Sequence, residues 1–180
     1  QVFVDTPWRA YVRGDDAALG AAGKRGALVF LRNVADGGAG CAGCHSGDFF
    51  TDERFYVLAV PQVGPGKDDE PYPDRADDAD EDLGRFHATF RDEDRYAFRT
   101  PTLLNVEVTG PYGHDGAYAT IEGIVRHHLD PTAAVRAYDA SQLGTAVAPD
   151  SWRERGRQNT ERALAKLAKD REAGRTPLVD

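Results

Sequence analysis

The sequence predicts a helical domain with long loops, on the basis of two observations. Apolar residues recur at helical spacing in three stretches, at about residues 16–34, 120–130 and 151–168. Glycine and proline gather between these stretches, in a glycine-rich break at 37–40 and in a segment at 61–82 that contains four prolines. With 180 residues, the chain is long enough for one domain with its own core.

The composition is that of an ordinary globular protein with an acidic balance. Hydrophobic residues make up 41% and charged residues 29% of the chain, and the net charge is -8. This charge predicts no nucleic-acid partner and favours a basic protein partner. No apolar run approaches the length that a membrane span needs, so none is expected. The chain starts at Gln1 and contains no methionine, which suggests a processed product or an excised segment.

The first 34 residues are expected to hold a connector and then a helix. Residues 1–14 mix aromatic side chains with a proline and lack a clear period, which is typical of a connector that packs on a neighbouring surface. A helix is predicted from about Asp16 to Val34, with Asp15 or Asp16 as its N-cap. The glycines at 37–40 end it. The residues that fall at helical spacing are Leu19, Ala22, Gly26, Val29 and Phe30.

The glycine-rich break leads into the motif Cys41-Ala-Gly-Cys44-His45, which is typical of covalent c-type haem attachment. Two thiols one turn apart can form thioethers with the two haem vinyl groups, and His45 then supplies the proximal iron ligand. Other interpretations are weaker. A thioredoxin-like CxxC needs a βαβ pattern that is not visible, and zinc needs four ligands although both cysteines of the chain lie here. A disulfide remains an alternative in an oxidising compartment.

The absence of methionine restricts the sixth iron position. Carriers with one haem commonly use His/Met ligation, and that pair is not available here. The sixth ligand must then be another histidine, a tyrosine or water, or the position stays open. The histidines other than His45 are His87, His114, His127 and His128.

Two features follow the attachment motif. Phe49 and Phe50 are candidates for the wall of the haem pocket, with ordinary core packing as an equal alternative. Nine acidic residues lie between Asp68 and Asp82, and this run predicts a solvated loop. The alternative is an acidic docking patch for a basic redox partner.

Further motifs occur along the chain in a fixed order, and together they resemble one family. It is the C-terminal haem domain of the bacterial di-haem cytochrome c peroxidases, including the MauG-like branch, and the resemblance runs from about Gly14 to about Gly144. The motifs are CAGCHSGDFFTD from Cys41, DLGR from Asp82, RTPTLLNV from Arg99, TGPYGHDGAY from Thr109, and a helix ending in RHHLDP at Pro131.

The resemblance implies an all-α, cytochrome c-like fold, covalently bound haem c and a periplasmic location. It implies a domain that relays electrons to a peroxidatic haem on another domain of a peroxide-reducing enzyme or MauG-like oxidase. The implied partners are that peroxidatic haem domain and a small electron donor such as a basic cytochrome c. The alternative is a stand-alone carrier or sensor with one haem and no catalysis, and a haem-free domain of the same fold is a third.

The chain departs from the family at both ends. The family carries an N-terminal haem domain with its own CxxCH and continues after a segment like 176–180 into a last helix, whereas this chain has one CxxCH and stops there. We therefore expect a fragment in which residues 1–14 connect to the missing domain and residues 15–180 form the haem domain without its final helix. The fragment alone should have little peroxidase activity. The family also holds calcium near Thr109 and Pro111, but half of that site would belong to the missing domain.

The helix predicted at 120–130 supplies the candidate distal ligand. Thr120 is a good N-cap, and Glu122 suits the positive end of the helix. His128 lies on the apolar stripe and His127 does not, so His128 is predicted to be buried and to bind iron. In the family the distal ligand comes from this helix, as methionine in the peroxidases and as tyrosine in the MauG-like branch, at the position that corresponds to His128. The apolar members of the stripe are Ile121, Ile124, Val125 and Leu129.

Three other side chains are expected near the haem. His114, in a tight glycine-containing loop, is expected near the haem edge or a propionate, with iron ligation as a minor alternative. Arg99 and Arg85 are candidate partners of the propionates, because a guanidinium pairs well with carboxylates, and a surface position is the alternative. The tail is expected to form a helix with Ser151 and Glu154 in capping-box spacing. Its apolar stripe is Ala163, Leu164, Leu167 and Ala168.

Overall fold

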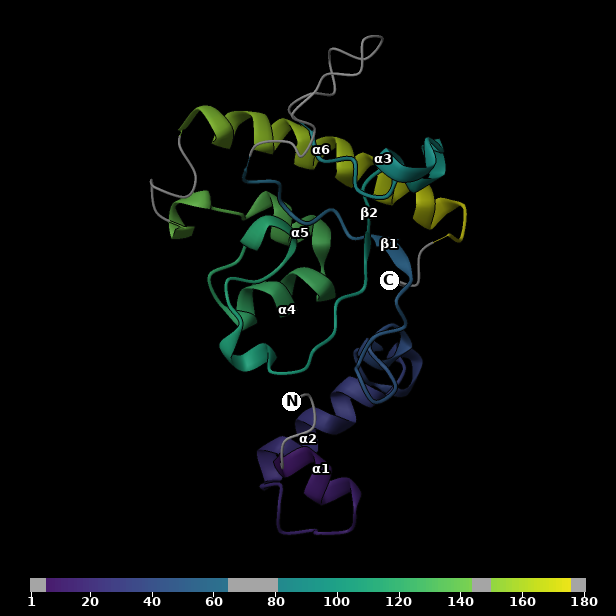
Figure 1. Cartoon of the computed structure of the whole chain (residues 1–180), viewed down its shortest axis with the longest axis vertical. Coiled ribbons are helices and arrows are strands. Elements are labelled where there is room, and N and C mark those ends of the chain that lie inside the picture. The colour runs from purple at the N-terminus through teal and green to yellow at the C-terminus, as the bar shows by residue number, and fades with distance from the viewer. Residues whose placement is uncertain (1–5, 65–80, 144–149, 176–180) are drawn as a thin grey trace. The chain divides into compact units, whose positions relative to one another are not determined.

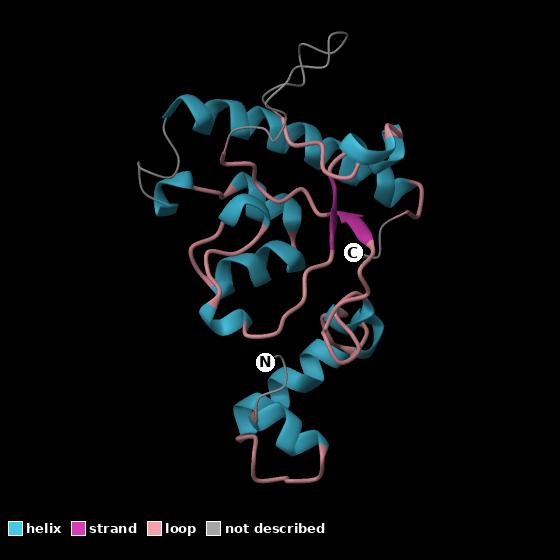
Figure 2. Ribbon diagram, in the orientation of Figure 1, coloured by secondary structure: helices cyan, strands magenta, loops and turns pink. Residues whose placement is uncertain are grey.

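The computed structural model of the chain describes residues 6–64, 81–143 and 150–175. These residues form short and long helices and one small sheet (Figures 1 and 2). The α-helices are α1 (Pro7–Val12), α2 (Ala21–Leu31), α3 (Phe86–Thr89), α4 (Ile121–Leu129), α5 (Pro131–Arg136) and α6 (Asp150–Glu172). The strands are β1 (Phe55–Val57) and β2 (Ala97–Arg99). The chain divides into two compact units, 1–52 with 102–104 and 53–101 with 105–180.

The small sheet modifies the prediction of an all-α fold. β1 and β2 pair antiparallel, with Phe55 opposite Arg99 and Val57 opposite Ala97. The described residues are therefore about half helical, with one two-stranded ladder, and an all-α fold is not confirmed. Within the described ranges, no helix combines the length and the apolar character that crossing a membrane would require.

The first unit contains two helices where one was predicted. Thr6 caps α1, since its Oγ1 accepts a hydrogen bond from the backbone N–H of Arg9 at 3.2 Å, and Pro7 occupies the first turn. The expected connector is thus partly helical. α2 starts at Ala21, five residues later than predicted from Asp16, and ends at Leu31. Asp15 does not cap it; its side chain accepts from Ala17 N–H at 3.0 Å in a turn before α2.

One core cluster of the second unit lies between α6 and the small sheet. Ala163 and Leu167 of α6 are buried against residues of β1, β2 and α3, which confirms these members of the predicted tail stripe, whereas Ala168 is exposed. The helix already begins at Asp150, so Ser151 is not its N-cap. Gly156 permits close packing, because a Cβ there would overlap the backbone oxygen of Gln62. The buried members of this cluster are Val57, Ala59, Leu83, Phe86, Tyr96, Ala97, Ala163 and Leu167.

The acidic run from Asp68 to Asp82 lies mostly outside the described residues, but Glu81 and Asp82 are described and buried. The prediction of a solvated loop is therefore wrong for these two. The hydroxyl of Tyr96 donates to Glu81 at 2.5 Å, and Arg162 pairs with the same carboxylate at 3.1 Å. Burial, together with this carboxylate, raises the pKa of Tyr96 well above its ordinary value.

The helix that carries the two adjacent histidines forms where it was predicted. α4 begins after Thr120, whose Oγ1 accepts from Gly123 N–H at 3.1 Å, so the predicted cap is confirmed. Asp130 ends α4 and caps α5, because its Oδ1 accepts from Ala133 N–H at 2.9 Å. Pro131 then occupies the first position of α5.

Candidate functional site

The Cys41–His45 motif folds into a single tight turn in the first unit. Residues Cys41–Gly43 form a short 3-10 helix, and the backbone N–H of His45 donates to the carbonyl of Cys41 at 2.9 Å. Both cysteines are thiols and partly buried. Partial burial raises the pKa of the Cys41 thiol, so this side chain stays protonated at neutral pH. The predicted arrangement of two thiols and an imidazole on one turn is present.

The last turn of α2 holds this motif in place. Ala39 N–H donates to the carbonyl of Val29 at 2.8 Å, and Gly40 N–H donates to the carbonyl of Arg32 at 2.9 Å. The chain passes so close to the helix end that a Cβ at Gly38 would overlap the backbone of Arg32. The glycine-rich break therefore does more than end the helix, because it brings the Cys41–His45 turn (the attachment turn) against α2.

The imidazole of His45 is oriented by its neighbours. Its Nδ1 lies 3.1 Å from the carbonyl oxygen of Phe50. Since a carbonyl only accepts, Nδ1 carries the hydrogen and the lone pair lies on Nε2. This is the tautomer that a proximal haem ligand needs, with a backbone carbonyl fixing the ring. The sequence predicted His45 but gave no sign that Phe50 would orient it.

The aromatic residues after the motif take different positions. The ring of Phe50 is partly buried and packs near Phe30 and Trp8, at centroid distances of 6.1 and 6.4 Å. Phe49 is exposed, and its carbonyl accepts from the hydroxyl of Thr102 at 2.6 Å.

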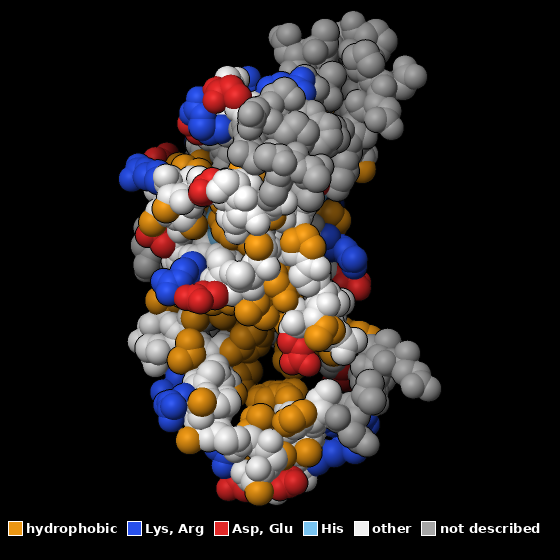
Figure 3. Space-filling model, turned by 90° about the vertical axis from the view of Figure 1, so that its left-hand side faces the viewer, with side chains coloured by type: hydrophobic (Ala, Val, Ile, Leu, Met, Phe, Trp, Pro, Cys, Tyr) orange, Lys and Arg blue, Asp and Glu red, His pale blue; other side chains and the backbone are white. Residues whose placement is uncertain are grey.

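The first unit exposes several large apolar side chains close in sequence to the attachment turn. Figure 3 shows hydrophobic side chains at the surface of the described residues. Where exposed apolar side chains form a contiguous patch, the patch is often a site that a ligand or partner covers. The exposed members in α2 and the segments that follow it are Leu28, Val29, Leu31, Val34 and Phe49.

In the second unit, the predicted burial of the α4 histidines is wrong. His127 is fully buried and His128 is only partly buried. The ring of His127 lies 2.9 Å from the hydroxyl of Tyr118 through Nδ1 and 2.7 Å from the carbonyl of Leu58 through Nε2. Burial lowers the pKa of His127 to about 4, so the ring is neutral, Nε2–H donates to Leu58, and Nδ1 accepts from Tyr118. Both ring nitrogens of His127 thus make internal contacts.

His128 lies instead on an exposed apolar face of α4. Its Nδ1 is 2.8 Å from the carbonyl of Ile124, so its lone pair lies on Nε2, as in His45. Its neighbours on this face, Ile121, Val125 and Leu129, are 41%, 50% and 62% exposed. Iron ligation by His128 stays a prediction, now with the correction that the stripe carrying it is not covered by the rest of the described unit.

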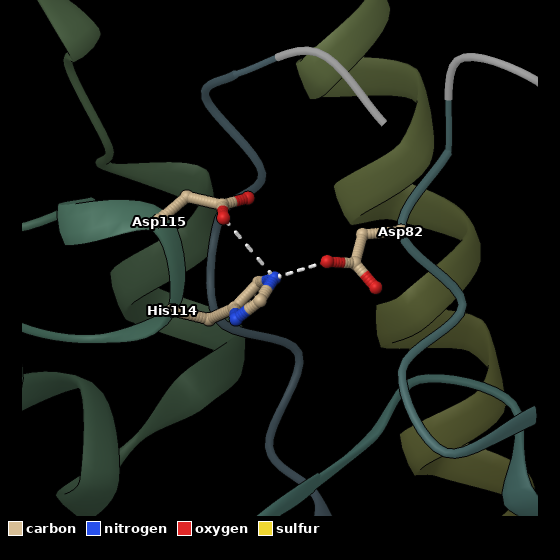
Figure 4. A group of neighbouring side chains, drawn as sticks. All are labelled: Asp82, His114 and Asp115. Atoms are coloured by element: carbon tan, nitrogen blue, oxygen red, sulfur yellow. Dashed lines mark hydrogen bonds and ion pairs between the residues drawn. The ribbon is translucent and has the colours of Figure 1, made fainter. Parts of the chain in front are cut away.

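His114 lies in a cluster with two carboxylates (Figure 4). Its Nε2 is 2.8 Å from Oδ2 of Asp82 and 3.3 Å from Oδ1 of Asp115. Its ring stacks on Phe98 with centroids 3.8 Å apart and planes inclined by 28°. The sequence singled out His114 but missed both aspartates, although each lies in one of the quoted motifs. His87 also contacts this segment, since its Nε2 accepts from Leu83 N–H at 2.9 Å.

The two arginines predicted for the propionates have partners within the second unit. Arg99 is exposed and lies 3.5 Å from the carboxylate of Glu53. Arg85 lies 3.5 Å from Asp94, and its guanidinium sits 4.6 Å from the ring centre of Phe55. Their role toward haem stays a prediction. Thr109 and Pro111, where the resemblance implied calcium, are exposed.

Comparison with known proteins identifies the relatives of this chain, although no family model matches it. It is 33% identical over 142 residues to a cytochrome c peroxidase of Denitromonas iodatirespirans and 34% identical over 127 residues to the methylamine utilization protein MauG of Methylorubrum extorquens. It is 30% identical over 149 residues to cytochrome c551 peroxidase of Pseudomonas aeruginosa. These alignments cover 66%, 69% and 83% of the chain. This chain is a homologue of the cytochrome c peroxidases and of MauG.

A solved structure agrees with this relationship. The crystal structure of a MauG-like protein associated with microbial copper homeostasis matches 68% of this chain, with a TM-score of 0.51 and 26% identity. The match covers 36% of that protein, and the chain spans 34%, 30% and 36% of the three sequence relatives. This homologue of the cytochrome c peroxidases thus corresponds to about a third of the relatives it matches.

The residues of the attachment turn fit the c-type haem that the cytochrome c peroxidase and MauG family implies. Cys41 and Cys44 offer two thiols one turn apart, and the lone pair of His45 lies on Nε2, the atom that would bind the iron of such a haem. The exposed apolar side chains of the same unit suit a large flat apolar ligand. The donor set, the tautomer and the surface all agree with the cofactor.

Proposed function

We propose that this chain is the electron-transfer haem c domain of a di-haem peroxidase or MauG-like oxidase. The observation that carries the proposal is the Cys41–His45 turn, in which Phe50 fixes the imidazole in the tautomer required of an iron ligand. When bound, haem supplies a one-electron iron couple. Relatives named as peroxidases and as MauG support the use of that couple in oxidoreductase chemistry.

In this proposal His45 and His128 are the two axial ligands. Each has its Nδ1 against a backbone carbonyl, Phe50 for His45 and Ile124 for His128, so in each ring the lone pair lies on Nε2, the nitrogen that would bind the iron. His127 is a poor ligand, because Tyr118 and Leu58 engage both of its nitrogens. Two imidazoles leave no open coordination position for peroxide, so the domain transfers electrons and does not itself react with peroxide.

A domain that transfers electrons without reacting with peroxide needs an electron donor and an electron acceptor. A peroxidatic haem domain of the same full-length protein receives the electrons, and a small basic redox protein donates them, in keeping with the net charge of -8. Covalent haem attachment and the peroxidase relatives support a periplasmic location. The competing function is a stand-alone one-haem carrier.

Spectroscopy of ligand variants tests the axial assignment. The haem-loaded chain should be low spin, without the near-infrared band of a sulfur ligand. His128→Ala should make the iron high spin or open to added ligands, and His127→Ala serves as the matched control with a nearly unchanged spectrum. A low-spin His128→Ala variant, or a high-spin His127→Ala variant, would overturn the assignment. A high-spin His114→Ala variant would do the same.

Turnover distinguishes relay from catalysis. The haem-loaded chain alone should reduce peroxide slowly, because its histidines are engaged as ligands or in internal hydrogen bonds and offer no acid–base group beside an open iron. Rapid peroxide-dependent turnover by the chain alone would contradict the relay role. Haem analysis of the full-length gene product then separates the relay, with two haems, from the stand-alone carrier, with one.

A further inference from the structure

We propose that Asp82, His114 and Asp115 form a binding site for a divalent first-row transition-metal cation, beyond the haem function proposed above. Within the described residues, this group brings one imidazole and two carboxylate ligand atoms within 4.8 Å of one another. All three residues belong to the second unit. Figure 4 shows the imidazole between the two carboxylates; Asp115 is the next residue of the same loop, and Asp82 comes from a separate segment of the chain.

The two distances from Nε2 of His114 to the carboxylate oxygens match the edges of a coordination polyhedron. Metal–ligand bonds of about 2.1 Å place neighbouring ligands about 3.0 Å apart in octahedral and about 3.4 Å apart in tetrahedral geometry. Nε2 of His114 lies 2.8 Å from Asp82 and 3.3 Å from Asp115. A cation can therefore take the place between Nε2 and the two carboxylate oxygens with small side-chain movements.

The carboxylate of Asp82 is held in one orientation by its neighbours. Gln62 fixes the backbone of Asp82 from both sides, accepting from its N–H at 3.2 Å and donating to its carbonyl at 2.7 Å. The second carboxylate oxygen, Oδ1, accepts from Gly84 N–H at 2.9 Å, which leaves Oδ2 directed at His114. The side chain of Asp82 is only 5% exposed, so this orientation is fixed by packing as well as by hydrogen bonds.

The imidazole is equally constrained. Its stacking on Phe98 sets the plane of the His114 ring and directs Nε2 toward the carboxylates. Asp115 follows directly in the chain with a left-handed backbone, φ 57°, which places its carboxylate beside the preceding imidazole. The side chains of His114 and Asp115 are 13% and 16% exposed, so an ion can reach them from solvent.

The donor set selects the class of cation. Calcium and magnesium prefer sites made of oxygen atoms alone, whereas one imidazole with two carboxylates suits zinc, manganese or ferrous iron. Three protein ligands leave further coordination positions for water. A bound ion would join the Asp82–Arg85 segment to the 113–116 loop, which the sequence keeps about 30 residues apart. The ion would stabilise the contact between the Asp82–Arg85 segment and the 113–116 loop.

Zinc titration of the haem-loaded full chain, after treatment with a chelator, tests the site. Calorimetry should show one zinc ion bound, and at about 100-fold excess over the dissociation constant the melting temperature should rise by about 5–10 °C. Asp82→Asn and His114→Gln should each weaken binding at least tenfold. Asp92→Asn is the matched control, because Asp92 is exposed and pairs with Arg95 outside the cluster.

A third variant keeps the test decisive if Asp82→Asn fails to fold. Asp115 is less buried than Asp82, so Asp115→Asn should fold even where Asp82→Asn does not, and it should also weaken zinc binding. Absence of zinc binding at millimolar concentration, or equal binding by Asp115→Asn and the control, would overturn the proposal. The haem spectrum should be unchanged throughout, so failure of this proposal differs from failure of the proposed haem function.

Discussion

Acid should destabilise this protein through His127. The ring is fully buried, and burial lowers its pKa to about 4, from 6.5 in an unfolded chain. The folded state therefore holds the neutral ring while the unfolded state takes up a proton below pH 6.5. The contribution of neutral His127 to the free energy of unfolding is fully present above pH 6.5 and is lost as the pH falls toward 4. The difference between these two pKa values of His127 corresponds to a loss of about 3 kcal/mol in the free energy of unfolding.

The assay compares wild type with His127→Gln, whose amide nitrogen can still donate to the carbonyl of Leu58. Urea unfolding is followed at pH 7 and pH 4.5, and the difference between the two proteins removes the titration of the shared carboxylates. Wild type should lose about 2 kcal/mol more than the variant between these pH values. An equal loss in both proteins would show that His127 is protonated in the folded state, and the reasoning from burial would fail.

Two further substitutions test the packing and the helix start of the second unit. Gly156→Ala should cost about 1–3 kcal/mol, because its Cβ would overlap the backbone of Gln62, whereas Gly26→Ala, with open space around it in α2, should be neutral or stabilising in thermal melts. Equal melting temperatures for the two would refute the close contact. Thr120→Ala should cost about 1 kcal/mol in urea unfolding, since Gly123 N–H loses its cap, and an unchanged midpoint would argue against that hydrogen bond.

Features set by neighbouring residues were predictable from the sequence. The Cys41–His45 turn needs only five consecutive residues and the glycines before it, and it forms as expected. The cap at Thr120 and the buried pair Ala163 and Leu167 likewise follow from local spacing. Each depends on short-range hydrogen bonds or on one strong helical stripe.

Features that depend on distant residues were not predictable in this way. Spacing shows that His128 shares a face with apolar residues, but it does not show which face of α4 the protein covers. The covered face is the one that carries His127, because the hydroxyl of Tyr118 and the carbonyl of Leu58 form hydrogen bonds with both nitrogens of its buried ring. The pairing of His114 with Asp82, 32 residues earlier, is hidden from periodicity for the same reason.

Covalent haem attachment at Cys41 and Cys44 is the central claim, and intact mass under denaturing conditions measures it directly. The chain is produced together with a cytochrome c maturation system, and Cys41→Ala with Cys44→Ala is the matched control. We predict that the wild-type chain carries the added mass of one haem, while the double variant carries none. A wild-type chain with the unmodified mass, or a double variant that still carries haem covalently, would contradict the account.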